Sequence, residues 1–432
     1  MSGMTGRPVL ALSHGGGGPP FTAAERGSLL DLERRALRYF LDNQAACGLI
    51  RDRQSNRGRL RPAGPCSTSA TGMGLIALAL ASAPPHRLLS RSEAVRRVEA
   101  ALAAALRLPH EEGIMPHFVG PNGVEPLGSD SLSTIDSGWL LAGALWAASF
   151  LDDGRLQDLA DELYERVNWR YWSAPAELGG AVLLRHGRGR DGRPIPWLWD
   201  RINGETIFLY VLAAGAGEGR AWPASSWPAL RPHYGEVAGH RFNNADLGLF
   251  VFQYGLDLID PREGPIGEDL DLMREAAVAT AANRDACRGS ARVFRTYRQF
   301  WGLSAGDGPG PSPTRTAYRA YSPTGPIDGT AQLMAALASI AHDPDAVFAN
   351  LHAARSQRAH APLGRYGLSN INLDRRWVGH DMVGIDAGAA VLALENALEG
   401  DRVRRIFHGL PSVRRGLARL GMTERSERRK AS

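Results

Sequence analysis

The sequence predicts an all-α fold arranged as a single (α/α)6 barrel, and three observations support this prediction. Twelve segments of the 432-residue chain carry apolar residues at helical spacing. Few segments show the strict alternation of a strand, and no linker-like change in composition divides the chain. Twelve helices can pair into six hairpins that close into a ring, which is the arrangement of this barrel.

The predicted helices follow one another from one end of the chain to the other. They cover residues 29–43, 67–83, 90–106, 132–151, 156–169, 205–216, 244–258, 268–287, 329–342, 344 onward, 387–398 and 402–420, the last broken by Pro411. Ser90 with Glu93 is typical of a capping box, and Asp343 before Pro344 marks another helix start. The second and fourth segments are apolar on nearly every side and are therefore expected to be buried.

Two long irregular segments interrupt the helices. Residues 173–200 alternate loosely and contain Gly and Pro, which predicts a short hairpin near the barrel mouth. Residues 301–328 are rich in Gly and Pro, and long loops of this kind are often functional. We expect residues 1–27 to form a flexible leader, 28–422 the barrel and 423–432 a charged tail.

The charge balance does not indicate nucleic-acid binding, although the net charge is +5. The only lysine is Lys430, and the arginines are spread along the chain among acids, which is typical of a solvated surface. Cys47, Cys66 and Cys287 show no metal-ligand spacing, so we expect reduced thiols and neither a disulfide framework nor a metal site.

Other functional classes lack their signatures. The chain has no phosphate-binding loop, dinucleotide fingerprint or metalloprotease motif, so no cofactor is expected. The sequence contains no run of about 18 apolar residues, so no membrane span is predicted. No signal peptide is recognisable, and the expected location is the cytoplasm. The sequence does not indicate an oligomeric state.

Three acids stand at the heads of apolar helices: Asp136, Glu205 and Asp386. Each alone could simply cap its helix. Together they indicate one site, because helix N-termini on one rim of an α-barrel converge. Glycoside cleavage needs one carboxylic acid that protonates the leaving oxygen and one carboxylate that activates water or attacks the sugar. Glu205 precedes Ile207 and Phe208, and apolar surroundings would keep it protonated.

Aromatic and polar side chains near the irregular segments could bind sugar rings and hydroxyl groups, although ordinary core packing is the more common explanation for each tryptophan alone. These residues are Trp197, Trp199, Tyr318, Tyr321, Trp377, Asp307, Arg319, Asp374 and Asp381. His117 could face the same site or be a structural histidine. The predicted partner is an oligo- or polysaccharide substrate.

A set of short motifs, specific in its order and spacing, resembles a known family. The pieces are Ile135-Asp136-Ser137, Asn203-Gly204-Glu205, Gly302-Leu303-Ser304-Ala305-Gly306-Asp307-Gly308-Pro309, Tyr318-Arg319-Ala320-Tyr321, Asp328-Gly329-Thr330, Tyr366-Gly367-Leu368, Asn372-Leu373-Asp374, Trp377-Val378 and Asp381-Met382-Val383-Gly384-Ile385-Asp386. They resemble the glycoamylase-like domain of bacterial endo-β-1,2-glucanases and cyclic β-1,2-glucan synthases, over roughly residues 30–407.

The resemblance implies an (α/α)6 barrel that hydrolyses a β-1,2-linked glucan without metal or organic cofactor. Glu205 would be the general acid, and Asp136 and Asp386 the candidates for base or water positioning. The implied sugar contacts are Asp307, Arg319, Tyr321, Trp377, Asp381, His117 and Gln253.

The sequence also departs from the family pattern. Ser133 replaces an acidic residue that often precedes the Val-Glu-Thr segment, and that segment keeps only the shorter acid Asp136. The His-Gln-Tyr-Ser-His stretch is reduced to residues 252–256, which retain Gln253. Two alternatives therefore stay open: a catalytically silent glycan-binding protein, and a transglycosylase of glucan or glycoconjugate synthesis.

Overall fold

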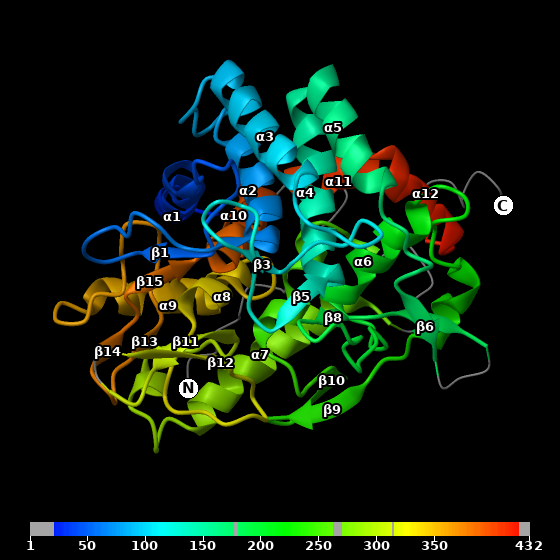
Figure 1. Ribbon diagram of the computed structural model, residues 1–432. Coiled ribbons are helices and arrows are strands. Elements are labelled where there is room, and N and C mark those ends of the chain that lie inside the picture. The colour runs from blue at the N-terminus through cyan, green and yellow to red at the C-terminus, as the bar shows by residue number, and fades with distance from the viewer. Residues whose placement is uncertain (1–20, 177–179, 262–269, 313–314, 423–432) are drawn as a thin grey trace.

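The protein is mostly helical, as predicted (Figure 1). The computed structural model describes residues 21–176, 180–261, 270–312 and 315–422. Its α-helices are α1 (Ala23–Asn43), α2 (Thr68–Leu80), α3 (Arg91–Leu106), α4 (Thr134–Leu151), α5 (Gly154–Glu165), α6 (Gly204–Gly215), α7 (Leu272–Gly289), α8 (Leu333–Ala338), α9 (Pro344–Ser356), α10 (Gly384–Leu398), α11 (Arg402–Gly409) and α12 (Pro411–Arg419). The predicted tail and residues 1–20 of the predicted leader lie outside the described residues. Within the described ranges, no helix is both long and apolar enough to cross a membrane.

Short antiparallel strands accompany the helices, which the all-α prediction did not include. They are β1 (Arg53–Ser55), β2 (Cys66–Ser67), β3 (Phe118–Val119), β4 (Pro126–Leu127), β5 (Asp130–Ser133), β6 (Ser173–Pro175), β7 (Val182–Leu184), β8 (Gly187–Gly189), β9 (Tyr234–Val237), β10 (His240–Asn243), β11 (Ala305–Pro309), β12 (Thr316–Ala320), β13 (Ile371–Asn372), β14 (Trp377–Val378) and β15 (Asp381–Val383). In the described chain none exceeds five residues, which is too short to leave a clear alternation. The β6–β7 pair confirms the hairpin predicted in residues 173–200.

Helix α1 begins at Ala23 rather than after Ser28, so the predicted start of the first helix is wrong by several residues. The start is fixed by a capping box. The Thr22 hydroxyl accepts a hydrogen bond from the Glu25 backbone at 3.2 Å, and the Glu25 carboxylate accepts one from the Thr22 backbone at 2.8 Å.

The continuous helix predicted over residues 244–258 is also wrong. This segment forms two short 3-10 helices, η2 (Leu249–Phe252) and η3 (Gly255–Asp257). Gly255 lies so close to α6 that an added Cβ would sit 1.7 Å from the carbonyl oxygen of Gly204. The chain therefore packs on α6 backbone against backbone, and the apolar pattern of this segment reflects burial rather than helical periodicity.

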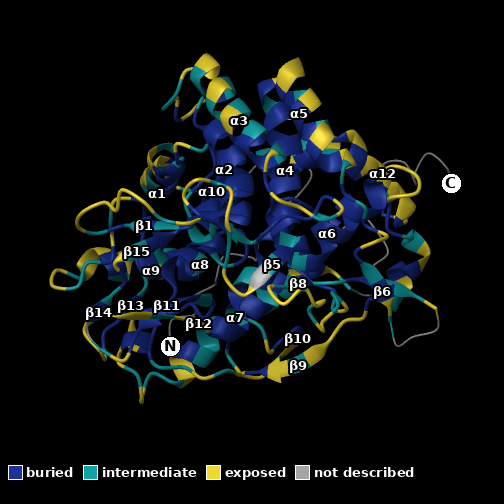
Figure 2. Cartoon of the chain, in the orientation of Figure 1, coloured by how far each residue is buried: buried dark blue, intermediate teal, exposed yellow. Residues whose placement is uncertain are grey.

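The inner helices contact one another in order. α2 packs on α4 and α10, α4 packs on α6, and α10 packs on α8, while η2 contacts both α6 and α8. A second layer lies outside them: α1 packs on α10, α3 on α2, α5 on α4 and α12 on α6. In Figure 2 the inner helices are buried over nearly their whole length, whereas α3 and α5 carry exposed faces.

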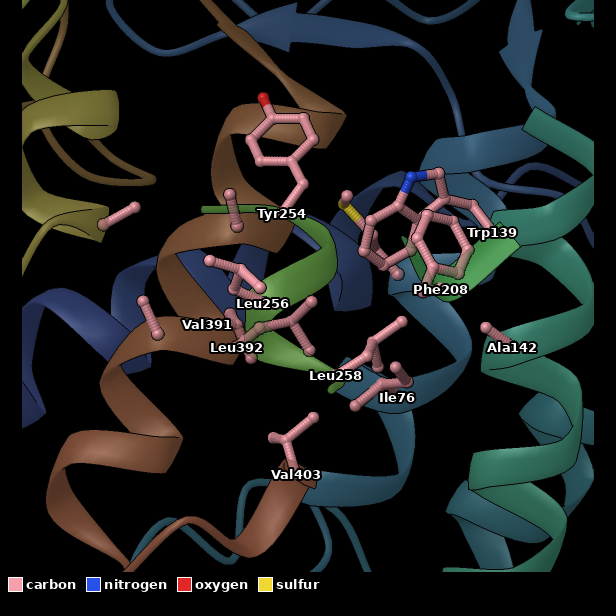
Figure 3. Packing of buried hydrophobic residues seen from close by; sticks show 14 of the residues in the cluster. Ile76, Trp139, Ala142, Phe208, Tyr254, Leu256, Leu258, Val391, Leu392 and Val403 are labelled. Atoms are coloured by element: carbon pink, nitrogen blue, oxygen red, sulfur yellow. The ribbon is translucent and has the colours of Figure 1, made fainter. Parts of the chain in front are cut away.

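Apolar side chains from the inner helices meet in one core (Figure 3). Ile76 of α2, Trp139 of α4, Phe208 of α6 and Leu392 of α10 converge there, and Val403 of α11 closes the cluster. The space between the inner helices is therefore filled at this level, and polar chemistry must take place at the helix ends.

Glycines set the close approach of α2 to α4. An added Cβ at Gly72 would lie 2.2 Å from the carbonyl oxygen of Trp139. We expect Gly72→Ala to force the helices apart and to lower the free energy of unfolding by about 2–3 kcal/mol, measured by urea denaturation. Gly27→Ala at an exposed position of α1 is the matched control, because an added Cβ there meets nothing within 4 Å and alanine favours helix. Equal destabilisation in both variants would contradict this explanation.

Candidate active site

The three predicted acids all lie in the first turns of inner helices. Asp136 is in the first turn of α4, Glu205 in that of α6 and Asp386 in that of α10. Strand β5 runs directly into α4 and β15 directly into α10, so the short strands build up the ends of the helices where the acids lie (Figure 1).

Ring contacts one helical turn further along bring α4 and α6 together at the acids. Residues three apart share a helix face. Asp136 therefore lies one turn before Trp139 on the same face of α4, and Glu205 lies one turn before Phe208 on the same face of α6. The Trp139 and Phe208 rings pack with centroids 4.6 Å apart. Asp136 and Glu205 are therefore neighbours at the edge of the apolar core where α4 and α6 begin.

Tyr254 connects this pair to Asp386. Its ring meets the edge of Trp139 with centroids 6.2 Å apart. Figure 3 shows its phenol oxygen pointing away from the apolar side chains, and this hydroxyl lies 3.5 Å from Oδ1 of Asp386. The fold therefore gathers all three acids from separate parts of the chain into one site.

Burial changes the titration of two of these acids. It raises the pKa of Glu205 to about 8, and the neighbouring negative charge of Asp136 adds to this rise. Burial also raises the pKa of Asp386 to about 7, where the charge of Asp307 contributes and that of Arg53 opposes. Around neutral pH, Glu205 is thus mainly protonated while Asp386 is close to its midpoint.

Asp136 is held from two sides. The Ser133 hydroxyl donates a hydrogen bond to its Oδ2 at 2.5 Å, and Nε2 of His117 lies 3.4 Å from its Oδ1. The His117 ring is itself stacked on Phe118, with centroids 3.7 Å apart. The structure therefore places His117 at the acid group, as one of the two sequence interpretations expected.

A second polar group adjoins Asp386. Arg53 of β1 contacts Asp52 at 3.0 Å and reaches across to the buried carboxylate of Asp307, also at 3.0 Å. Strand β1 pairs with β15, which leads into α10, and Asp381 of β15 forms an ion pair with Arg61 at 3.0 Å. These charged side chains can bind the hydroxyl groups of a sugar beside Asp386.

An aromatic group lies beside the head of α4. Trp199 donates a hydrogen bond from its indole nitrogen to the Thr134 hydroxyl at 3.0 Å. His186 stacks on Trp199 with centroids 3.7 Å apart, and Trp197 packs on the edge of His186. Trp197 is 66% exposed, so the group presents an open aromatic face of the kind on which sugar rings stack.

The sequence matches the family described as “Putative glucoamylase” over residues 196–411, half of its length. The chain belongs to the glycoamylase-like family. No curated protein matches its sequence.

Solved structures share the fold of this glycoamylase-like chain at low sequence identity. A protein of the same description from Bacteroides fragilis NCTC 9343 is 21% identical, with a TM-score of 0.78 over 95% of this chain and 100% of that one. An endo-β-1,2-glucanase from Chitinophaga pinensis is 19% identical, with 0.77 over 92% and 98%. A β-1,2-glucanase from Parabacteroides distasonis is 19% identical, with 0.76 over 94% and 61%.

Arg319 and Tyr321 do not join Asp307, although the sequence suggested that all three contact substrate. In the β11–β12 hairpin Asp307 lies opposite Tyr318, and neighbouring residues of a strand point to opposite faces. Arg319 turns away and binds Asp328 at 3.0 Å. With Tyr321 it lines a separate cavity of about 330 Å³ on the far face of the hairpin.

Trp377, Gln253 and Asp374 are engaged within the glycoamylase-like fold. The Trp377 ring is buried. The Gln253 amide donates hydrogen bonds to Ala335 at 2.7 Å and to Ser339 at 2.6 Å, so it holds η2 against α8. Asp374 accepts backbone hydrogen bonds of 2.8 and 3.1 Å at the start of η5 (Thr296–Arg298). Among the described residues, the Trp377 indole nitrogen and Oε1 of Gln253 have no hydrogen-bond partner, so a substrate contact of these two residues stays a prediction.

The sequence analysis missed Arg53, Asp52 and Tyr254, and it did not connect Tyr318 with the acids. Arg53 reaches the site only because β1 pairs with β15, and such pairing between distant short strands leaves no local signal. Tyr254 stood inside a segment interpreted as a helix. The Asp52-Arg53 dipeptide in the segment between α1 and α2 was the only available clue.

Proposed function

We propose that this protein is a glycoside hydrolase that cleaves a β-linked glucan, with β-1,2-glucan or its oligosaccharides as the substrate. The carrying observation is that Glu205 and Asp386 share one site with pKa values of about 8 and about 7. Burial keeps a proton on Glu205 near neutral pH, as a general acid needs, while part of Asp386 is ionised, as a general base needs. The names of two structures that share the fold, an endo-β-1,2-glucanase and a β-1,2-glucanase, support this substrate class.

The proposal extends to the architecture of the fold. We infer that α2, α4, α6, the η2–η3 segment, α8 and α10 form the inner ring of an (α/α)6 barrel, with the acids on its rim. The support is the order of contacts, in which each member packs on the next and α10 returns to α2.

In the proposed reaction Glu205 transfers its proton to the glycosidic oxygen as the bond from that oxygen to C1 breaks. Asp386 removes a proton from a water molecule whose oxygen bonds to C1 from the opposite face, which inverts the anomeric configuration. Asp136 acts on Glu205 through its charge, whereas Asp386 lies on the other side of the site beside the Tyr254 hydroxyl. We therefore assign Asp386 as the base; a separation of about 6.5–9.5 Å between the two carboxyl groups would leave room for the water of an inverting reaction.

Other residues would position the sugar relative to Glu205 and Asp386. The ion-paired group of Arg53, Asp307 and Asp381 supplies charged donors and acceptors for hydroxyl groups beside Asp386. Tyr318, half exposed on the same face of the hairpin as Asp307, and exposed Trp197 supply rings for stacking. Productive positioning of this kind contributes strongly to rate.

Incubation with a panel of glucans tests the proposal. We expect β-1,2-glucan to give shorter oligosaccharides by chromatography, while β-1,3-glucan and α-1,4-glucan give none. Cleavage of the α-linked polymer alone would contradict the assigned linkage. Binding of β-1,2-oligosaccharides in calorimetry without any product would indicate the silent glycan-binding alternative, and products longer than the substrate would indicate transglycosylation.

A further inference from the structure

A second cluster of titratable side chains lies away from the candidate active site. Glu33 of α1, His86 in the loop after α2 and Glu395 of α10 each present a ligand-type atom, and these atoms lie within 4.8 Å of one another. The three side chains are buried, with exposed fractions of 0% for both glutamates and 6% for the histidine. Glu395 is nine residues after Asp386, so the cluster lies roughly 14 Å further along α10.

The polar atoms of this cluster face one another rather than the rest of the described chain. Both carboxylate oxygens of Glu33, both ring nitrogens of His86 and Oε2 of Glu395 are buried and form no hydrogen bond of good geometry. Nε2 of His86 lies 2.9 Å from Oε2 of Glu33 in an ion-pair contact, and the carboxyl groups of Glu33 and Glu395 also contact each other. Buried polar atoms are normally satisfied, and three groups that converge with so few other partners are arranged like ligands of a shared cation.

The arginines around the cluster do not match all of its carboxyl groups. Arg402 contacts Oε1 of Glu395 at 2.5 Å and Glu399 at 3.0 Å, and Arg26 contacts Glu399 at 2.6 Å. Burial raises the pKa of Glu33 and Glu395, so these two carboxyl groups ionise together readily only when a further cation joins them. Oε2 of Glu395, both oxygens of Glu33 and the ring of His86 stay available for a cation.

We propose that Glu33, His86 and Glu395 bind a divalent transition-metal ion, with Zn²⁺ as the best fit. Imidazole nitrogen and carboxylate oxygen are both ligands that Zn²⁺ accepts, and a fourth position can be held by water. The ion joins α1, the loop after α2 and the C-terminal part of α10. Because the cluster stands far along α10 from Asp386, its role is structural, and metal binding contributes to the stability of the fold.

Metal analysis of the untagged full-length protein tests this site. After loading with Zn²⁺ and dialysis, we expect about one Zn²⁺ per chain in the wild type and a Tm that falls when a strong chelator removes the ion. His86→Gln should lose the bound Zn²⁺ and the Tm response to chelator. His342→Gln, at another buried histidine outside the cluster, is the matched control and should keep both.

Two results would overturn the proposal. A wild-type protein that retains no Zn²⁺ and whose Tm ignores both metal and chelator would mean that the three side chains only share protons. Equal Zn²⁺ retention by the wild type and the His86→Gln variant would mean that the metal binds elsewhere. The Zn²⁺ content and Tm of the wild type test the proposal even if the variant fails to fold.

Discussion

Replacing Glu205 with glutamine is expected to abolish glucan cleavage, with a fall in kcat/KM of about 10³-fold or more. Glutamine keeps the size of the side chain and its hydrogen-bonding capacity but cannot transfer a proton to the leaving oxygen. The measurement is product release from β-1,2-glucan at pH 7. Glu236→Gln, an exposed glutamate on β9, is the matched control and should keep full activity.

The same variant should be more stable than the wild type at alkaline pH. The pKa of Glu205 is raised from 4.5 to about 8 in the folded protein, so above pH 4.5 the unfolded chain releases this proton more readily than the folded one. The wild type therefore loses stability as pH rises from about 4.5 to 8, whereas glutamine carries no charge. We expect a higher Tm for the variant at pH 9 and no difference at pH 4. A lower Tm at both values, with activity lost, would instead indicate a structural role for Glu205.

The helices and the acids at their heads could be predicted because their signals are local. Asn203 accepts a hydrogen bond from Thr206 at the start of α6, and the apolar run that follows is continuous. The start of α1 and the break at Gly255 were missed for opposite reasons. At α1 a capping signal stood inside a leader interpreted as flexible. At Gly255 an apolar run hid a close backbone contact with α6.

Only the site residues that open a helix could be predicted from the sequence. Asp136, Glu205 and Asp386 were found because each opens an apolar helix, but their contacts come from elsewhere. Arg53 arrives through β1–β15 pairing, and Arg319 is turned from the site by the alternation of β12. The Glu33–His86–Glu395 cluster is a similar case, because its three members belong to elements that only the tertiary fold brings together.

Asp386→Asn is expected to abolish hydrolysis as well, and azide should restore turnover. With the base removed, water is no longer activated, but azide needs no deprotonation and can attack C1 from the vacant side while Glu205 still protonates the leaving oxygen. An inverting reaction on a β-linkage would then give the α-glycosyl azide, which NMR identifies. A β-glycosyl azide would contradict the inverting mechanism, and wild-type activity in the variant would exclude Asp386 as the base.

The Asp136→Asn variant distinguishes the role of Asp136 from that of Asp386. If Asp136 acts through its charge on Glu205, its removal lowers the pKa of Glu205, although burial, the larger cause, still holds that pKa above its ordinary value. The alkaline limb of the kcat/KM profile, near pH 8 in the wild type, should therefore move to lower pH while measurable activity remains. Ser133→Ala removes the hydroxyl bonded to Asp136 but keeps the charge, so its alkaline limb should stay near pH 8. An unmoved limb in Asp136→Asn, together with azide rescue of that variant, would instead make Asp136 the base.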